Sequence, residues 1–303
     1  MAKICGIGAC VSDLLLSLPA YPTEDTKVCA ENVRTCGGGP VATGLCAAAK
    51  LGVSAAFIGD LAGDDAGVFL KNDFLSRNVA VPFVNLIPDT RSFRSVLWLC
   101  ADKGSRTCVF DRGNVPERPL TEEEKALIAE AEILMVDGNR LEMALEGAKI
   151  AKENGTRVLY DCGGLYEGVE KLLALTDIMI PSEEFALGAT GCDSPRRAAE
   201  ALYKTYSPEI VVVTQGKRGG LLYDGLGTYG YPIYPAKVVD SNGAGDVFHG
   251  AFAAGTIFGL SPLRCCHFSS AVSALKCTGI GARDSVPDFE TVREFLKVNG
   301  FEL

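Results

Sequence analysis

The chain has 303 residues, and its 29 Lys and Arg against 38 Asp and Glu give a formal charge of −9. With 48% hydrophobic and 22% charged residues it has the composition of a folded globular protein, which excludes a disordered chain. The negative charge and the lack of a Lys/Arg run argue against a nucleic-acid partner, which requires a basic surface. Two His are too few for a multi-His metal site.

The twelve Cys are scattered through apolar segments and form no C-x-x-C pair. This pattern is typical of a reducing compartment, where thiols serve as small core residues. The apolar segment at 4–11 ends at Ser12 and Asp13, so it predicts a buried first strand and not a signal peptide. No apolar run approaches the ~18 residues that cross a membrane. We therefore expect a cytoplasmic protein with no membrane partner.

From about residue 121 the sequence alternates between helical and strand patterns. Thr121 and Glu124 form a capping box that opens a helix, and Gly155 is placed to end the helix that begins near Leu141. Ser194-Pro195 predicts another helix start. Short apolar strands are predicted at 133–136, 157–160, 178–180 and 210–214. This rhythm predicts an α/β fold with a parallel sheet and right-handed crossovers.

Residues 9–114 show a different pattern. The segments 28–35 and 93–110 are extended in character, and Asp102–Ser105 predicts a hairpin turn between two strands. We interpret these strands as a small β lid over the carboxyl ends of the parallel strands. The chain is then one domain over 1–303, with lid segments inserted at about 10–37 and 88–114.

Gly225, Gly227 and Gly230 match the G-x-G-x-x-G dinucleotide fingerprint by spacing alone. Pro232 and Pro235 follow immediately, so the helix that the fingerprint requires cannot begin there. We interpret this segment as a hairpin turn.

The turn that leads to Asp246 carries the strongest functional signal. A strand ends, small residues follow, and an Ala-rich helix begins. The N–H groups of Gly243, Ala244 and Gly245 at a helix N-terminus would form an anion site. Asp246, in the first helical turn, is placed to deprotonate a hydroxyl aimed at a bound phosphoryl group. The alternative is a tight strand–helix turn in which Asp246 only complements the helix dipole.

The same turn, Asp240-Ser241-Asn242-Gly243-Ala244-Gly245-Asp246, resembles the C-terminal signature of the ribokinase (PfkB) family of sugar kinases. Other segments resemble family motifs in the same order: the di-glycine sugar segment at 38–43, the N-terminal signature at 57–67, the nucleotide strand–turn at 213–219 and the adenine-side loop at 279–282. The resemblance covers essentially the whole chain. It implies a ribokinase-like three-layer α/β/α sandwich with a small β-strand lid.

The resemblance also implies an ATP-dependent carbohydrate kinase that transfers the γ-phosphoryl group to a primary hydroxyl. Asp246 matches the catalytic base, with the anion hole at Gly243, Ala244 and Gly245. The sugar-binding positions match Asp13, Gly38, Gly39 and Thr43, where Thr43 replaces the Asn that family members usually carry. The ATP-binding positions match Thr214, Gly216, Gly219 and Gly281.

Two kinds of metal ion follow from the resemblance. Family members bind an activating monovalent cation such as K⁺ at positions matched here by Asp240, Asn242, Gly281 and Ser285. They also carry an Asn-x-x-Glu motif linked to Mg²⁺, which Ser182 and Phe185 replace in this chain. Either Glu183 or Glu184 holds the Mg²⁺ through a water molecule instead, or the Mg²⁺ is held mainly by ATP.

Finer matches at 37–43, 213–216, 246–251 and 274–278 are similar to bacterial sulfofructose kinases. Lys27 takes the place of a lid lysine that helps hold the sulfonate in that branch. The branch also carries an Asn in the lid, and its position falls near Phe110 in this chain. An Arg of the branch is matched here only by Asn139 or Arg140. We expect a ketohexose-like substrate, with 6-deoxy-6-sulfofructose as one candidate.

Several alternatives stay open. They are a neutral fructokinase or ribokinase, a nucleoside kinase, and a catalytically weak sugar- or nucleotide-binding regulator on the same fold. The exposed edges of the lid strands also predict pairing between two copies of the chain as a homodimer.

Overall fold

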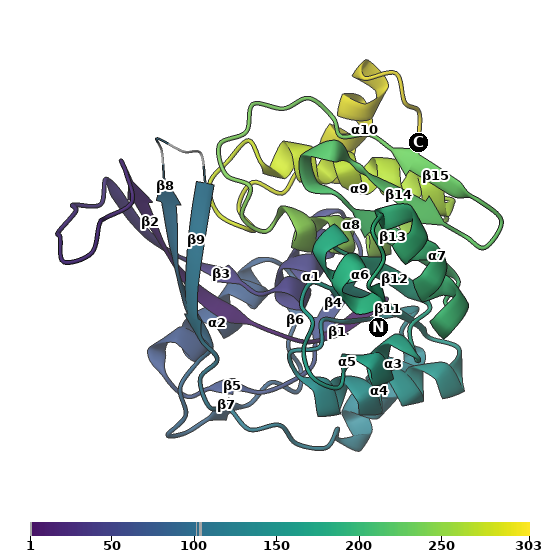
Figure 1. Ribbon diagram of the computed structural model, residues 1–303. Coiled ribbons are helices and arrows are strands. Elements are labelled where there is room, and N and C mark those ends of the chain that lie inside the picture. Colours follow the sequence, from purple (N-terminus) through teal and green to yellow (C-terminus); the bar gives the residue numbers. More distant parts are fainter. Residues whose placement is uncertain (1, 101, 103–104) are drawn as a thin grey trace.

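A computed structural model describes residues 2–100, 102 and 105–303 (Figure 1). Its largest element is a nine-stranded sheet in which the strands from β6 to β13 run parallel, as predicted, while β14 and β15 add an antiparallel edge. The turn between β14 and β15 contains Gly225 and Gly227, which confirms the predicted hairpin. In spatial order the strands are β15 (Thr228–Tyr231), β14 (Gly220–Tyr223), β13 (Ile210–Thr214), β12 (Ile178–Pro181), β11 (Arg157–Cys162), β10 (Ile133–Val136), β1 (Ile4–Ile7), β4 (Ala55–Phe57) and β6 (Val79–Ala80).

Helices cover both faces of this sheet, because its strands are apolar on both sides. In β10, Ile133 and Met135 pack into one core cluster, and Leu134 and Val136 pack into the other. The first cluster is closed by α1 (Pro40–Lys50), α2 (Asp65–Ser76), α8 (Ala244–Ile257), α9 (Pro262–Lys276) and α10 (Phe289–Val298). The second is closed by α3 (Glu122–Glu130), α4 (Leu141–Asn154), α5 (Val169–Leu173), α6 (Glu183–Thr190) and α7 (Pro195–Tyr206). The result is a three-layer α/β/α sandwich.

The predicted helix boundaries are confirmed by their caps. Thr121 and Glu124 form the capping box of α3, and Ser194 caps α7 through a bond from the Arg197 N–H. Gly155 ends α4 in the left-handed conformation that favours glycine. These contacts are local, so they could be predicted from neighbouring residues.

A second sheet of four strands stands apart from the main body (Figure 1). It corresponds to the segments predicted as the lid, and we call it the lid sheet. Its spatial order is β3 (Asn32–Gly38), β2 (Val11–Leu18), β8 (Arg94–Cys100) and β9 (Ser105–Asp111). The predicted hairpin between β8 and β9 includes Lys103 and Gly104, which lie outside the described residues. The short strands β5 (Leu61–Ala62) and β7 (Leu86–Ile87) pair separately.

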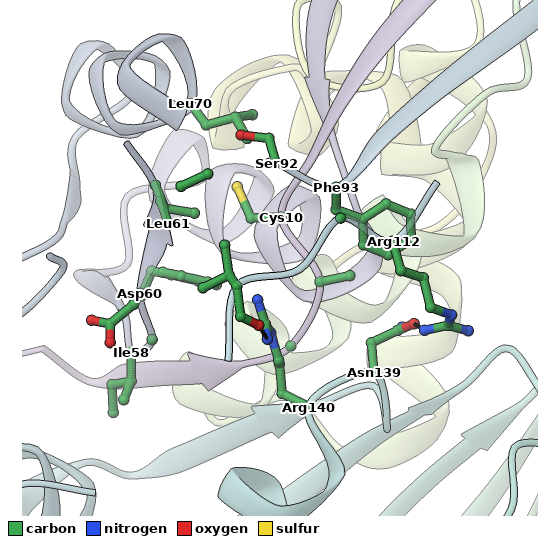
Figure 2. Close-up of a pocket in the computed structure, with 17 residues that line it drawn as sticks. Cys10, Ile58, Asp60, Leu61, Leu70, Ser92, Phe93, Arg112, Asn139 and Arg140 are labelled. Atoms are coloured by element: carbon green, nitrogen blue, oxygen red, sulfur yellow. Dashed lines mark hydrogen bonds between the residues drawn. The ribbon is translucent and has the colours of Figure 1, made fainter. Parts of the chain in front are cut away.

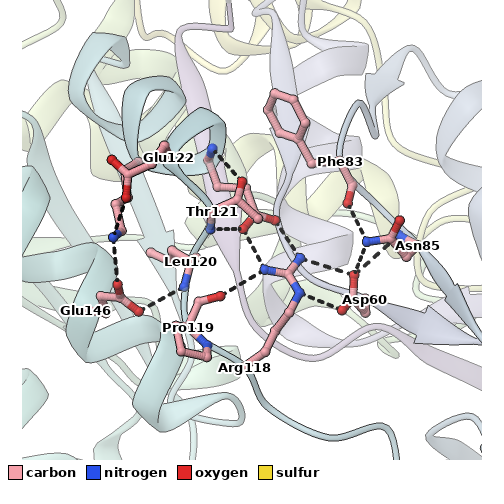
Figure 3. Close-up of polar contacts among 11 residues, drawn as sticks. Asp60, Phe83, Asn85, Arg118, Pro119, Leu120, Thr121, Glu122 and Glu146 are labelled. Carbon is pink, nitrogen blue, oxygen red and sulfur yellow. Dashed lines mark hydrogen bonds and ion pairs between the residues drawn. The ribbon is translucent and has the colours of Figure 1, made fainter.

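Arg118 ties the segment that follows the lid sheet to the main body (Figure 3). Its guanidinium binds Asp60 with an Nε–Oδ2 distance of 2.7 Å, and it binds both oxygens of Glu124 at 2.7 and 2.9 Å. The side chain of Glu124 is fully buried and that of Asp60 is 6% exposed. One arginine therefore neutralises two carboxylates, of which one is fully buried and the other nearly so.

All twelve Cys are free thiols, and most are buried among apolar side chains. This agrees with their predicted use as core residues. Within the part of the chain that the structure describes, no helix is both long enough and apolar enough to cross a bilayer.

Candidate active site

A cavity of about 180 Å³ lies between the lid sheet and the N-terminus of α8. Asp13, Gly39, Asn242 and Asp246, which belong to distant parts of the sequence, all line it. The side-chain amide nitrogen of Asn242 is buried there without a hydrogen-bond partner among the described residues. The structure thus brings the predicted base and part of the predicted sugar site to one cavity, which also contains Val11, Pro40, Phe93, Ser95, Leu97, Cys108, Phe110 and Ala282.

Asp13 enters this cavity from β2. Its Oδ1 accepts a 2.6 Å hydrogen bond from the Ser95 hydroxyl of the neighbouring strand β8. Burial raises the pKa of Asp13 to about 6, although the bond from Ser95 and the charge of Arg283 oppose the shift. A Cβ atom on Gly38 would lie 2.0 Å from Asp13 Oδ2, so only glycine lets the two strands place the carboxylate here.

The turn predicts an anion site at the N-terminus of α8. Gly243 precedes the helix with φ +75°, and a Cβ atom there would lie 2.6 Å from the Ala282 side chain. The N–H of Ala244 donates to the Ser241 oxygen at 3.2 Å, whereas the N–H groups of Gly245 and Asp246 have no acceptor within their own helix. A Cβ atom on Gly245 would meet nothing within 4 Å, so an anion can approach these N–H groups.

Asp246 lies in the first turn of α8, and burial raises the pKa of its carboxyl group. His249, one turn further, opposes this shift through its charge. The His249 ring is fixed, because Nδ1 lies 2.6 Å from the Gly245 oxygen and 3.2 Å from Asp161 Oδ2, while Nε2 lies 3.0 Å from the Ile180 oxygen. Sequence analysis assigned no role to Asp161, although its place at the end of a predicted strand was a usable signal.

Two arginines that sequence analysis missed bind residues around this site. Arg283 is buried and donates to the Gly38 oxygen at 2.5 Å and to Thr43 Oγ1 at 3.3 Å. Thr43 is buried and is not among the residues that line the cavity. Arg106, on β9, donates to the Ser241 hydroxyl at 3.0 Å and so connects the lid sheet to the turn before α8.

The predicted nucleotide positions gather at the carboxyl end of β13. Thr214 ends this strand. Gly216 begins the single helical turn Gly216–Arg218 and Gly219 follows it, and both glycines have positive φ angles. Gly281 lies elsewhere, where its N–H donates to Asp240 Oδ2 at 2.9 Å.

Ser182 and Phe185, which replace the motif residues linked to Mg²⁺, contact other groups of the protein. Ser182 Oγ caps α6 by accepting from the Phe185 N–H at 3.1 Å, and the Phe185 ring packs against Tyr160 in the core. Glu183 pairs with Gln215 and Arg218. Among residues 2–100, 102 and 105–303, no group of three or more acidic, His or Cys side chains could hold a metal ion. Ser182, Glu183 and Phe185 are thus engaged by other protein groups, whereas Glu184 is exposed at the start of α6.

The predicted K⁺ site contains a lysine. Lys276, at the end of α9, is fully buried, and its Nζ donates to the main-chain oxygens of Asp240 at 2.9 Å and of Asn242. The Ser285 hydroxyl donates to the main-chain oxygen of Lys276 at 2.6 Å. Burial lowers the pKa of Lys276, and the Asp240 carboxylate opposes this. With these oxygens engaged, the residues do not fit a bound K⁺.

A second cavity of about 170 Å³ adjoins the first and shares Phe93 with it. Figure 2 shows Arg140 directed into this cavity and Arg112 beside Asn139, whose Oδ1 accepts a 2.8 Å bond from Arg112. Neither arginine forms an ion pair with a carboxylate of the described residues. Lys27 is exposed in the loop between β2 and β3 and lines neither cavity.

Comparison with known proteins decides the family. The model of the pfkB family carbohydrate kinases matches residues 1–288. The chain belongs to this family. It is 25% identical to a ribokinase of Haemophilus influenzae, over 96% of this chain and 97% of the relative. As a member of the family, it is an ATP-dependent carbohydrate kinase.

Solved structures agree with the fold. Arabidopsis thaliana ribokinase, complexed with ribose and ATP, is 26% identical and superposes with a TM-score of 0.87 over 98% of this chain and 99% of that one. A putative ribokinase from Agrobacterium tumefaciens has a TM-score of 0.91 at 24% identity, with complete coverage of both chains. The three-layer sandwich is therefore the ribokinase fold.

The raised pKa of Asp13 leads to a pH prediction for this kinase. As a carboxylate, Asp13 can accept hydrogen bonds from substrate hydroxyls, and protonation removes this capacity. Since burial raises its pKa to about 6, we expect kcat/KM for the sugar to fall as the pH drops through 6. Asp13→Asn should lower kcat/KM at pH 8 and remove the part of this dependence that Asp13 contributes, leaving the part caused by protonation of Asp246, whose pKa burial also raises. A wild-type profile that stays flat down to pH 5 would contradict the assignment.

Proposed function

We propose that this kinase phosphorylates the primary hydroxyl of a ketohexose-like sugar that carries an anionic group at its other end, with 6-deoxy-6-sulfofructose as the first candidate. The observation that carries the proposal is the pair of adjoining cavities. One contains Asp13 and Asp246, and the other contains Arg112 and Arg140.

The second cavity suits an anion for reasons of charge. Arg112 lies over the rings of Phe93, Phe110 and Tyr166, with its Cζ 5.8, 5.6 and 4.9 Å from the ring centroids. These contacts orient the guanidinium without neutralising it. Arg140 donates to the Val115 oxygen at 2.7 Å, which leaves its charge unpaired as well. A sulfonate, carboxylate or phosphate can accept charge-assisted hydrogen bonds from both.

At the other end of the sugar, Asp246 accepts the proton of the primary hydroxyl. The hydroxyl oxygen then attacks the γ-phosphorus of ATP, and the bond from that phosphorus to the bridging oxygen of ADP breaks. The N–H groups at the start of α8 stabilise the negative charge on the transferring phosphoryl group. Mg²⁺, bound mainly to the ATP phosphates, would neutralise phosphate charge. The lid sheet excludes water, which suppresses hydrolysis of ATP.

The ATP ligands follow from the position of β13. Thr214, Gly216 and Gly219 lie at the carboxyl end of this strand, where ligands of α/β sheets usually bind. We propose that these residues contact the ATP phosphates and ribose.

Substrate selectivity tests the proposal. ADP release should be measured with 6-deoxy-6-sulfofructose, fructose, ribose and inosine. We expect Arg140→Met to raise KM for the anionic sugar roughly 10- to 100-fold, because a charge-assisted hydrogen bond is lost, and to leave KM for fructose nearly unchanged. Arg264→Met, on the exposed side of α9, is the matched control.

The other outcomes separate the alternatives. Equal preference for fructose or ribose, with no effect of Arg140→Met, would indicate a neutral sugar kinase and overturn the anionic-substrate proposal. Turnover of inosine alone would indicate a nucleoside kinase. Binding of sugar or nucleotide without turnover of any of these compounds would favour a regulator.

We also propose that two copies pair through the lid sheet. β9 is an edge strand of this sheet, and Val109 and Phe110 on it are 62% and 56% exposed. Light scattering should then give the mass of a dimer, and Val109→Lys should shift it to that of a monomer.

A further inference from the structure

We infer that the ammonium group of Lys276 is a tethered replacement for the monovalent cation, so that this kinase works without K⁺. The inference goes beyond the proposed function, because it concerns the cation requirement of phosphoryl transfer whatever the sugar is.

The ammonium group of Lys276 lies against main-chain oxygens of the predicted cation site. Lys276 has no exposed surface, and its Nζ donates to the main-chain oxygens of Asp240 and Asn242. Oxygen atoms are the ligands that hard cations such as K⁺ prefer, and these two oxygens belong to positions matched to that ion. The lysine therefore occupies the place of the ion with a charge of the same sign.

The residues around Lys276 are held by further hydrogen bonds. The Asp240 carboxylate accepts from the N–H of Asn242 at 2.8 Å and from the N–H of Gly281 at 2.9 Å. The Ser285 hydroxyl donates to the main-chain oxygen of Lys276. All four residues matched to the cation site are thus held in one network with Lys276. A K⁺ ion would have to displace the ammonium group and would meet a like charge fixed beside it.

Lys276 is also linked to the turn that leads into α8. Asn242 is followed directly by Gly243, Ala244 and Gly245, so the bonds to Lys276 fix the turn that presents the anion-binding N–H groups. A buried positive charge next to this turn also favours the negative phosphoryl group. Lys276 is in this view a positioning residue, which acts through the turn and does not touch the substrate.

The test compares KCl with tetramethylammonium chloride at equal ionic strength, using the best sugar of the panel. For the wild-type enzyme we expect kcat in the two salts to agree within about twofold. Loss of a hydrogen bond to a charged group would change kcat far more, by roughly tenfold or above. Activation of the wild type by K⁺ beyond roughly tenfold would overturn the inference.

Lys276→Ala gives the complementary measurement. It leaves two main-chain oxygens without a cation and opens space for one. We expect its kcat in tetramethylammonium chloride to fall roughly 10- to 100-fold, and KCl to restore most of the loss. KCl should also raise its melting temperature, which reports ion binding without any sugar or ATP. A role limited to packing would give the loss without either response to K⁺, and that result would also overturn the inference.

Two variants complete the design. Lys276→Met keeps the volume of the side chain and so leaves no space for an ion, and K⁺ should therefore not restore the activity of this variant. Lys50→Ala removes an exposed lysine from the end of α1 and should behave as the wild type. If Lys276→Ala fails to fold, the wild-type comparison still decides the question. If no sugar of the panel is turned over, the melting temperatures in the two salts decide it, so failure of the substrate proposal is distinguishable.

Discussion

Asp246→Asn should lower kcat by about 10²- to 10⁴-fold, the range expected when a general base is removed. The amide keeps the size of the carboxylate and its place in the first turn of α8, but it cannot accept the proton of the attacking hydroxyl. Binding of the sugar should persist, because Asp13 and the backbone around Gly39 still line the cavity. Steady-state kinetics and calorimetric titration with the sugar measure the two effects separately.

The matched control is Asp65→Asn. Asp65 also lies in the first turn of a helix, α2, but it is exposed and lines neither cavity. If both variants lose little activity, Asp246 acts only as a partner of the helix dipole, and the assignment of the base is wrong.

Arg118→Met should destabilise the protein by about 3–5 kcal/mol, the usual cost of removing one partner from a buried ion pair. The methionine leaves Asp60 and the fully buried Glu124 without their cation (Figure 3). Urea unfolding at pH 7 measures this as a lower transition midpoint. The loss should shrink at acid pH, because protonation removes the uncompensated charges.

Arg197→Met provides the comparison for that experiment. Arg197 pairs with Asp193 at 3.0 Å, but the two side chains are 71% and 73% exposed. Exposed pairs contribute only about 0–1 kcal/mol, so this variant should unfold near the wild-type midpoint. Equal effects of the two substitutions would show that burial does not decide the contribution of Arg118.

The local parts of the site were predictable because adjacent residues make them. The anion site was predicted from three small residues at the N-terminus of a helix, and the hairpin at Gly225 from the prolines that come after it. The strand pattern of β10 indicates burial on both faces, since all four of its residues are apolar. These features depend on helix capping, turn conformation and side-chain alternation, which act over a few residues.

The contacts of Arg283 and Lys276 could not be predicted in this way. Arg283 reaches Thr43 across 240 positions of sequence, and Lys276 reaches Asn242 across 34. In the sequence each is one basic residue among 29. Only the packing of α9 and the loop after it decides that these two side chains are buried against main-chain oxygens.

The net charge of −9 does not conflict with an anionic ligand, because Arg112 and Arg140 keep unpaired charge at one cavity and the N–H groups at the start of α8 are the proposed anion site beside the other. The sequence by itself determined the family and the fold, since these rest on local motifs in order, and it predicted Asp246 as the base. The tertiary structure decided which basic side chains line the cavities and which are neutralised by carboxylates, because charge pairing depends on side chains that meet only after folding.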